Sequence, residues 1–273
     1  MLGRTKSVER GSDRLGERRR NRRRRTVIAF CILVLILLGT CIWGLQQNSV
    51  RISRVEISGA DTSFSTYATT AMQGSYLGII PRDSIFFFPE DRIRADILAA
   101  HQDIAAVSIT RSSLTSLSIK IDKRTPIARW CGLAPTLGVE EYCYIFDANG
   151  FIFAPASTTT EPLNSFSLYA LLTNNMLEPL RATLSRADQL PAVFDFARQL
   201  STLGASTTQI VIRDNSEVDD YLANGTRVTY VLGNEQNAFT ALVSARDNFS
   251  LADGSVDYID LRFDGKVYLK RRE

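Results

Sequence analysis

The segment RRRNRRRRTVIAFCILVLILLGTCIWGL, residues 18–45, joins seven arginines to nineteen residues without a charged side chain, Val27 to Leu45. As a helix with a rise of about 1.5 Å per residue, the apolar run spans roughly 29 Å, close to the ~30 Å hydrocarbon core of a bilayer. Arginine and lysine concentrate on the cytoplasmic side of a membrane span. The sequence therefore predicts a basic cytoplasmic tail at 1–25, a transmembrane helix at 26–46, and an exported remainder.

Three other interpretations of this segment are weaker. A cleaved signal peptide has a shorter apolar region, about 7–15 residues, that ends in a small-x-small site, whereas this run leads into Trp43-Gly44-Leu45. The arginines would also suit a nucleic-acid patch, but their position beside the span already explains them. A buried core helix would show a polar face, and this run has none.

Charge is distributed unevenly along the chain. Residues 1–25 hold 11 of the 32 Lys and Arg and 3 of the 29 Asp and Glu, which leaves 21 basic and 26 acidic residues in the rest. Nucleic-acid binding by the exported part would need a basic face, and none is evident. The part beyond the span is long enough for one large or two small domains with their own cores.

The four cysteines fall into two pairs. Cys31 and Cys41 lie within the span, and Cys131 and Cys143 lie beyond it, where oxidation can occur. A bridge between the second pair would close a short ring and contribute about 3 kcal/mol on the chain-entropy model. The alternative is two free buried thiols, and the spacing is not that of a zinc site.

Residues just beyond the span alternate strands and helices. Apolar side chains at every second position predict a strand at 50–57, which Gly59 ends. Helices are predicted from a Ser63 cap to about Gln73 and from Pro89 onward, with Ile93, Ile97 and Leu98 as the buried stripe of the second. Strands follow at 104–111 and 116–122. The order β-α-α-β-β predicts a small two-layer α+β unit.

After Thr125-Pro126 the pattern becomes mostly β with two helices. Strands are predicted at 127–130, 142–146, 151–153, 208–213, 217–222, 226–232, 256–262 and 266–270, with hairpin turns at Asp147–Gly150 and Asp264-Gly265. Helices are predicted from Pro191 and at about 235–249, and residues 155–164 are predicted to form a surface loop. The fold class is therefore α+β, with an N-terminal transmembrane helix.

Several motifs, in this order, resemble the FtsQ/DivIB family of bacterial cell-division proteins over nearly the whole chain. They are Ile52-x-x-Val55-x-Ile57-x-Gly59, Gly74-Ser75-Tyr76-Leu77, Lys123-Arg124-Thr125-Pro126-Ile127-Ala128-Arg129-Trp130, Phe146-Asp147-x-x-Gly150-x-x-Phe153, the helix from Leu190, and Tyr258-Ile259-Asp260-Leu261-Arg262-Phe263. The chain departs from the family at Ser112–Thr115, where many members carry Trp-Pro, and at Lys123, where an acidic residue is common. The resemblance implies a POTRA domain at 50–124 and an FtsQ-type β domain at 125–273.

The resemblance also implies a function. Members of this family are scaffolds at the division septum of the cell membrane that hold FtsB and FtsL, a coiled-coil pair, during septal peptidoglycan synthesis. The C-terminal edge strand of their β domain accepts an extended partner segment. An edge strand suits this role because its unpaired N–H and C=O groups can bond an added strand.

The candidate partner-binding residues are Tyr258, Asp260, Arg262, Phe263 and Lys266, with Phe263 as the anchor. Because neighbours along a strand point to opposite faces, Ile259 and Leu261 cannot share a face with Tyr258, Asp260 and Arg262, so one of these sets is expected to be structural. A weaker candidate surface, for other divisome proteins, comprises Arg92, Arg94, Ile119 and Lys120.

The sequence does not predict an enzyme. Its single histidine, His101, cannot build a typical zinc site, and no catalytic motif is present. Glu140-Glu141 and Asp219-Asp220 are adjacent carboxylates, but neighbours on a strand point apart and make no acid/base pair. We expect no catalytic residue, metal or cofactor. The alternative function is a POTRA-containing secretion or assembly factor, although such proteins usually carry repeated POTRA units or a downstream barrel.

Overall fold

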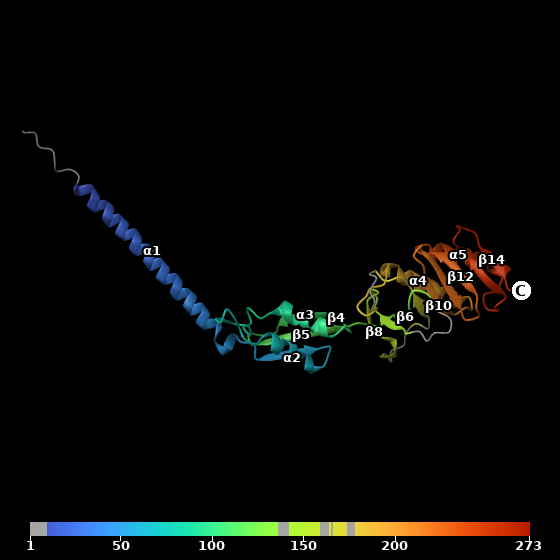
Figure 1. Cartoon of the computed structure of the whole chain (residues 1–273), viewed down its shortest axis with the longest axis horizontal. Helices are drawn as coiled ribbons and strands as arrows, with labels where there is room; N and C mark the ends of the chain where they lie inside the picture. The colour runs from blue at the N-terminus through green and yellow to red at the C-terminus, as the bar shows by residue number, and fades with distance from the viewer. Residues whose placement is uncertain (1–9, 136–141, 159–163, 165, 174–177) are drawn as a thin grey trace, which may run out of the picture. The chain divides into compact units, whose positions relative to one another are not determined.

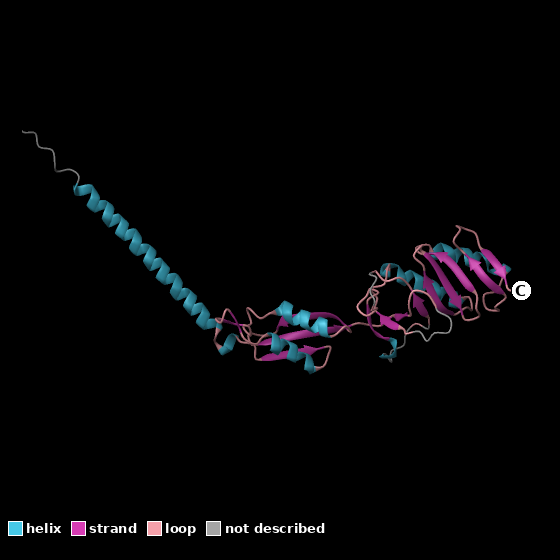
Figure 2. Cartoon of the chain, viewed as in Figure 1, coloured by secondary structure: helices cyan, strands magenta, loops and turns pink. Residues whose placement is uncertain are grey.

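The computed structural model describes residues 10–135, 142–158, 164, 166–173 and 178–273 (Figure 1). Within these ranges it contains five α-helices and one large sheet, which confirms a mixed helix-and-sheet fold. The chain divides into two compact units: the first comprises the residues up to Ala100 and Ala106–Asp122, the second His101–Ala105 and Lys123–Glu273. Figure 2 distinguishes the helices and strands of each unit.

Helix α1 runs from Arg10 to Leu45. Its portion Arg22–Leu45 is long and apolar enough to cross a membrane, and none of it is buried against the rest of the protein. A core helix would be covered by other elements, so this exposure argues against that interpretation. The helix begins well before the predicted span because arginine and glutamate are good helix formers and continue it into the basic segment.

The first unit contains a three-stranded sheet in the order β1-β5-β4, in which β1 (Arg54–Ser58) runs parallel to β5 (Ser116–Lys123). Strand β4 (Ile104–Arg111) has the predicted bounds. Alternate residues Leu117, Ile119 and Ile121 of β5 are fully buried, as their spacing indicates. Gly59 ends β1 at φ +85°, and a Cβ there would lie 2.1 Å from the Ile121 carbonyl oxygen, so only glycine fits.

Helices α2 (Ser65–Ala71) and α3 (Glu90–Ala100) complete the first unit. Helix α2 is shorter than predicted because Ser63 lies in a 3-10 turn, Thr62–Phe64, and does not cap the helix. In α3, Ile93 and Ile97 are buried but Leu98 is exposed, so the prediction for Leu98 was wrong. A short hairpin of β2 (Ser75–Tyr76) and β3 (Ile80–Pro81) was not predicted.

The second unit is a nine-stranded sheet in the order β14-β13-β12-β11-β10-β9-β6-β7-β8. Its strands are β6 (Ala128–Trp130), β7 (Tyr144–Phe146), β8 (Ile152–Pro155), β9 (Ser167–Tyr169), β10 (Thr207–Ile212), β11 (Glu217–Leu222), β12 (Arg227–Val231), β13 (Val256–Asp260) and β14 (Tyr268–Arg271). The pairs β6–β9, β9–β10 and β12–β13 are parallel, and the other neighbouring pairs are antiparallel. Eight of these strands follow predicted segments, while β9 was not predicted.

Two helices, α4 (Leu190–Thr202) and α5 (Glu235–Ala245), cover one face of this sheet and form the main core with it. Val193, Phe196 and Leu200 of α4 are buried, as their helical spacing predicts. The Phe196 ring lies 4.2 Å from the Tyr230 ring of β12, centroid to centroid. Helix α5 ends earlier than predicted and continues as a 3-10 turn, Arg246–Asn248.

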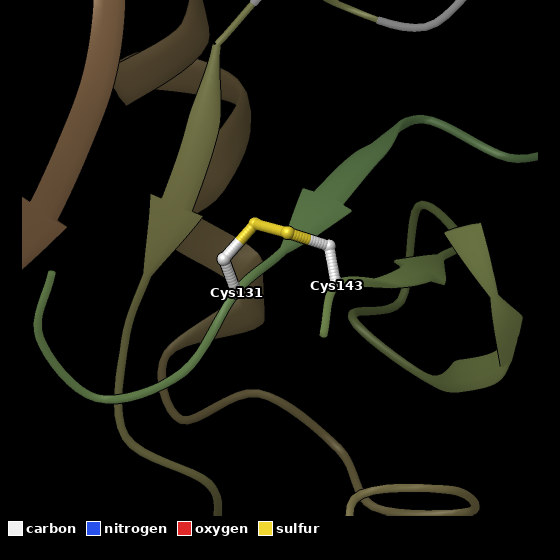
Figure 3. Close-up of a disulfide and its surroundings, with 2 residues drawn as sticks. All are labelled: Cys131 and Cys143. Atoms are coloured by element: carbon white, nitrogen blue, oxygen red, sulfur yellow. A yellow bond between two sulfur atoms is a disulfide. The ribbon is translucent and has the colours of Figure 1, made fainter. Parts of the chain in front are cut away.

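The opposite face of the sheet carries a smaller cluster. Cys131 and Cys143 form a disulfide there (Figure 3). Cys131 clusters with the buried side chains of Tyr169 and Val211, and Tyr221 packs against them. The bridge joins the end of β6 to the start of β7, so it restrains the connection between two neighbouring strands.

Candidate protein-binding face and edge strand

The candidate site lies on the β10–β14 part of the large sheet, on the face that α4 and α5 do not cover. We call this the open face. Along β11 the side chains alternate between the faces: Val218 and Leu222 belong to the helix-covered core, whereas Glu217, Asp219 and Tyr221 belong to the open face. A two-residue repeat in the sequence therefore decides which side chains are available to a partner.

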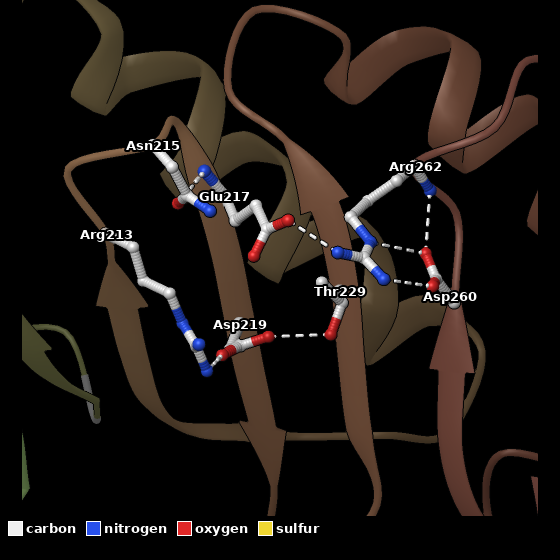
Figure 4. Close-up of polar contacts among 7 residues, drawn as sticks. All are labelled: Arg213, Asn215, Glu217, Asp219, Thr229, Asp260 and Arg262. Atoms are coloured by element: carbon white, nitrogen blue, oxygen red, sulfur yellow. Dashed lines mark hydrogen bonds and ion pairs between the residues drawn. The ribbon is translucent and has the colours of Figure 1, made fainter.

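Two charged networks occupy the open face (Figure 4). In the first, the Asp219 carboxylate pairs with the Arg213 guanidinium and accepts a hydrogen bond from the Thr229 hydroxyl, 2.6 Å from Oγ1 to Oδ1. Asp219 is buried although it lies on the open face, because its neighbours cover it. Its charge is satisfied within the sheet and is not offered to a ligand.

The second network joins two strands, β11 and β13, through Arg262. The guanidinium binds both carboxylate oxygens of Asp260, at 2.9 Å from Nε and 2.6 Å from Nη2, and also donates to Glu217. These hydrogen bonds from Arg262 lower the pKa of Asp260 and of Glu217 below their usual values, and they raise the pKa of Arg262. Arg262 therefore fixes the end of β13 against β11.

Three of the five predicted partner-binding residues, Tyr258, Asp260 and Arg262, share the open face, whereas Ile259 and Leu261 belong to the core. Strand β13 lies one position in from the edge, because β14 pairs with it. Residues of β13 therefore cannot offer main-chain groups to an added strand. The Arg227 guanidinium lies 5.5 Å from the Tyr258 ring centre. Asp260 and Arg262 pair with each other, so all three predicted residues already make contacts within the sheet.

The other two predicted residues, Phe263 and Lys266, lie in the turn between β13 and β14 and are exposed. The Phe263 side chain is 52% exposed, and its ring meets the Tyr268 ring edge-on with centroids 5.4 Å apart. Tyr268, the first residue of β14, is exposed as well. The two rings form an exposed aromatic pair, the Phe263–Tyr268 pair, at one end of the edge strand.

The edge strand itself was not among the predicted site residues. Pairing places Tyr258 opposite Lys270 and Asp260 opposite Tyr268, and the Arg272 amide donates to the Ser255 carbonyl at 2.9 Å. Main-chain groups of alternate residues point to the same side. Those of Leu269 and Arg271 therefore point away from β13, where no described strand follows. The signal in the sequence was the terminal Tyr268-Leu269-Lys270-Arg271 alternation.

The weaker surface in the first unit is corrected in part. Ile119 is fully buried and cannot touch a partner. Arg92, Arg94 and Lys120 each pair with carboxylates close to them in sequence: Arg92 with Asp96, Arg94 with Glu90 and Asp91, and Lys120 with Asp122. These pairs leave little unbalanced charge on that surface.

Side chains suited to metal binding do not gather anywhere in the described residues. His101 is partly exposed, with Nδ1 4.0 Å from an Asp103 carboxylate oxygen. Asp219 and Asp220 lie on opposite faces of β11, as predicted, and Glu140-Glu141 lies outside the described residues. Neither a protein-family model nor a curated protein matches this sequence.

Proposed function

We propose that this chain is a single-pass, non-enzymatic scaffold of the bacterial divisome, of the FtsQ/DivIB type, with its N-terminus in the cytoplasm and both folded units outside the cell membrane at the septum. The first unit would be the POTRA domain and the second the β domain that binds FtsB/FtsL-like partners. The ordered motifs from Ile52 to Phe263 and the membrane-length helix support this proposal.

The observation that carries the proposal is the open edge of β14. An extended partner segment can pair with the N–H and C=O groups of Leu269 and Arg271, each bond contributing about 0.5–1.5 kcal/mol net. The Phe263–Tyr268 pair adds an aromatic surface beside those groups. Several bonds and one buried ring reach about −8 kcal/mol, which corresponds to micromolar affinity.

The test is a titration of the full chain, in lipid nanodiscs, with the ectodomain of the FtsB-like protein from the same organism. Arg271→Pro removes an amide that points away from β13, so the sheet keeps its main-chain hydrogen bonds and loses only the one from the Arg271 guanidinium to the Asn248 carbonyl. Arg271→Ala is the matched control, since it removes the same side chain and keeps the amide. We expect Arg271→Pro to weaken binding by about tenfold or more and Arg271→Ala to leave it nearly unchanged.

A second pair of variants tests the Phe263–Tyr268 pair. Phe263→Glu is expected to weaken binding, whereas Tyr142→Glu, at an exposed tyrosine before β7 and far along the sheet from β14, is expected to have no effect. Equal binding by Arg271→Pro and Arg271→Ala would contradict strand addition at β14. Absence of binding by the unaltered chain would contradict the divisome role and favour the secretion or assembly alternative.

A further inference from the structure

Exposed apolar side chains gather at one end of the first unit. Outside α1, the described residues of this unit expose six large hydrophobic side chains, and five of them lie in three neighbouring loops: Leu77, Ile79, Phe86, Phe87 and Leu114. We call these five residues the apolar rim. The sixth, Leu98, lies near the opposite end of α3. Single exposed apolar residues need no explanation, but several on neighbouring loops indicate a contact surface.

Hydrogen bonds tie the loops of the apolar rim to the segment that leaves α1. The Ile85 amide donates to the Val50 carbonyl at 3.0 Å, and the Ile52 amide donates to the Asp83 carbonyl at 2.7 Å. The Ser53 amide donates to the Thr115 carbonyl at 2.9 Å, next to Leu114. Val50 follows the last residue of α1, Leu45, after only a few residues, so the rim is held near the end of that helix.

Leu77 has an unusual backbone conformation for a leucine. It precedes Gly78 at the tip of the β2–β3 hairpin, with φ +51° at Leu77 and +73° at Gly78, and the Ile79 amide donates to the Tyr76 carbonyl at 3.0 Å. This is a type I′ turn, whose first central position favours Asn, Asp or Gly. The leucine is nevertheless 96% exposed. Neither local conformation nor packing explains it, which points to a contact made outside the unit.

Aromatic and basic groups accompany the apolar rim. The Arg82 guanidinium lies 5.2 Å from the Tyr76 ring centre, and that of Arg111 lies 5.4 Å from the Phe88 ring centre. Trp43, near the end of α1, is exposed. Tryptophan and tyrosine are enriched where protein meets the headgroup layer, and arginine is attracted to anionic lipid. This mixture is typical of a membrane-facing surface.

We propose that the apolar rim docks on the outer surface of the bilayer that α1 crosses, with Leu77 and Phe86 in the interfacial layer. The argument for lipid over a protein partner is continuity, because the short link to α1 brings the rim to the membrane whatever else binds. This inference rests on the membrane anchor in the proposed function. Docking would restrain the first unit at the membrane surface.

The test measures the depth of nitroxide labels in the full chain, reconstituted into phosphatidylethanolamine–phosphatidylglycerol vesicles. Single cysteines are introduced by Leu77→Cys, Phe86→Cys, Leu98→Cys and Leu35→Cys, in a background in which Cys31 and Cys41 are alanine and the Cys131–Cys143 disulfide is intact. Collisions with oxygen report lipid, and collisions with a nickel chelate on both sides of the membrane report water. Leu98 is the matched control, an exposed leucine of the same unit outside the rim.

Labels at positions 77 and 86 are expected to favour oxygen severalfold over the label at 98, and the label at 35 to lie deeper still. Aqueous readings at 77 and 86 with a deep label at 35 would overturn docking and leave the anchor intact. An aqueous reading at 35 would overturn the anchor and docking together. Labels at 77 and 86 shielded from both reagents would show that protein covers the rim, which also overturns the proposal.

A second variant tests docking without disturbing the fold. Leu77→Asn suits the type I′ turn and removes one side chain of the rim. The label at position 86 is expected to move toward water in this variant. An unchanged depth at 86, with Leu77→Asn folded, would show that Leu77 does not contribute to membrane contact and would overturn its part in docking.

Discussion

The two faces of the nine-stranded sheet provide opposite environments for an aspartate, as the neighbouring residues Asp219 and Asp220 show. Asp219 lies on the open face, where Arg213 and Thr229 satisfy its carboxylate. Asp220, the next residue, lies fully buried in the helix-covered face between Ile210 and Val228 of the neighbouring strands. The difference shows that the strand repeat decides which carboxylate finds a partner.

Asp220 is fully buried, and neither of its carboxylate oxygens has a hydrogen-bond partner in the described part of the chain. The same holds for the hydroxyl of Tyr230, which is also fully buried. Burial raises the pKa of Asp220 well above its usual value, and the charge of Asp219 adds to the rise. Burial likewise raises the pKa of Tyr230. Burial on the covered face therefore favours the neutral acid form of Asp220 over its carboxylate.

The largest expected effect is a difference in stability loss when an aromatic ring is truncated on one face or the other. Phe196→Ala, in the helix-covered core, should lower the free energy of unfolding by about 3–5 kcal/mol because it leaves a cavity beside Tyr230. Tyr258→Ala, on the open face, should lower it by only about 1 kcal/mol, since the ring is partly exposed and contacts Arg227. Urea unfolding of the detergent-solubilised chain, followed by Trp130 fluorescence with Trp43→Phe, measures both. Equal losses would contradict the contrast between the faces.

The next effect has opposite signs at adjacent positions. Asp219→Asn should lower the free energy of unfolding by about 1–3 kcal/mol, because it weakens charged hydrogen bonds and leaves Arg213 without its partner. Asp220→Asn should raise it by about 1 kcal/mol at pH 7, since the unfolded chain no longer gains by ionising that residue. The same fluorescence assay measures both variants. A loss of stability in Asp220→Asn at pH 7 would show that Asp220 has a partner that it needs.

The pH dependence of Asp220→Asn provides its control. A raised folded-state pKa means that stability falls as the pH rises above the unfolded value, about 3.9, toward the folded value. The gain in Asp220→Asn should therefore grow from acid toward neutral pH over that window. A gain that is independent of pH between about 4 and 7 would contradict ionisation of Asp220 as its cause.

The smallest effect concerns the Arg262 network. Because the pKa of Asp260 and of Glu217 is lowered in the folded chain, their contribution is present above about pH 4.5 and is lost as the pH falls through the lowered values. Arg262→Gln should reduce the free energy of unfolding by about 0.5–1 kcal/mol at pH 7, a small value because the guanidinium is partly exposed to solvent. It should also flatten the decline below pH 4.5. An unchanged acid limb would contradict this assignment.

Much of the fold was accessible from the sequence because it depends on local periodicity. Strand β4 and the buried face of α4 appeared where alternation and helical spacing predicted them. Among the misses, β9 was not predicted at all, and Ser63 could begin either a 3-10 turn or a helix. Boundaries shifted by a few residues where a helix end tightened, as at Ala245.

The candidate site was less predictable. The sequence identified the last hairpin but favoured β13, because the motif Tyr258-Ile259-Asp260-Leu261-Arg262-Phe263 carries the family resemblance there. Strand order decides which strand is at the edge, and order depends on pairings between distant segments. Ile119 was misplaced on the surface even though its two-residue spacing with Leu117 and Ile121 indicated a buried position.

By itself, the sequence determined the membrane-length helix, the α+β class and the opposite orientation of Asp219 and Asp220, because each follows from composition or from a repeat along one segment. Only the tertiary structure decided that β14 is the edge, that the Asp220 carboxyl lacks a partner in the described residues, and that loops with exposed apolar side chains are hydrogen-bonded to the segment after α1. These features depend on contacts between residues distant in the chain, and no local pattern encodes such contacts.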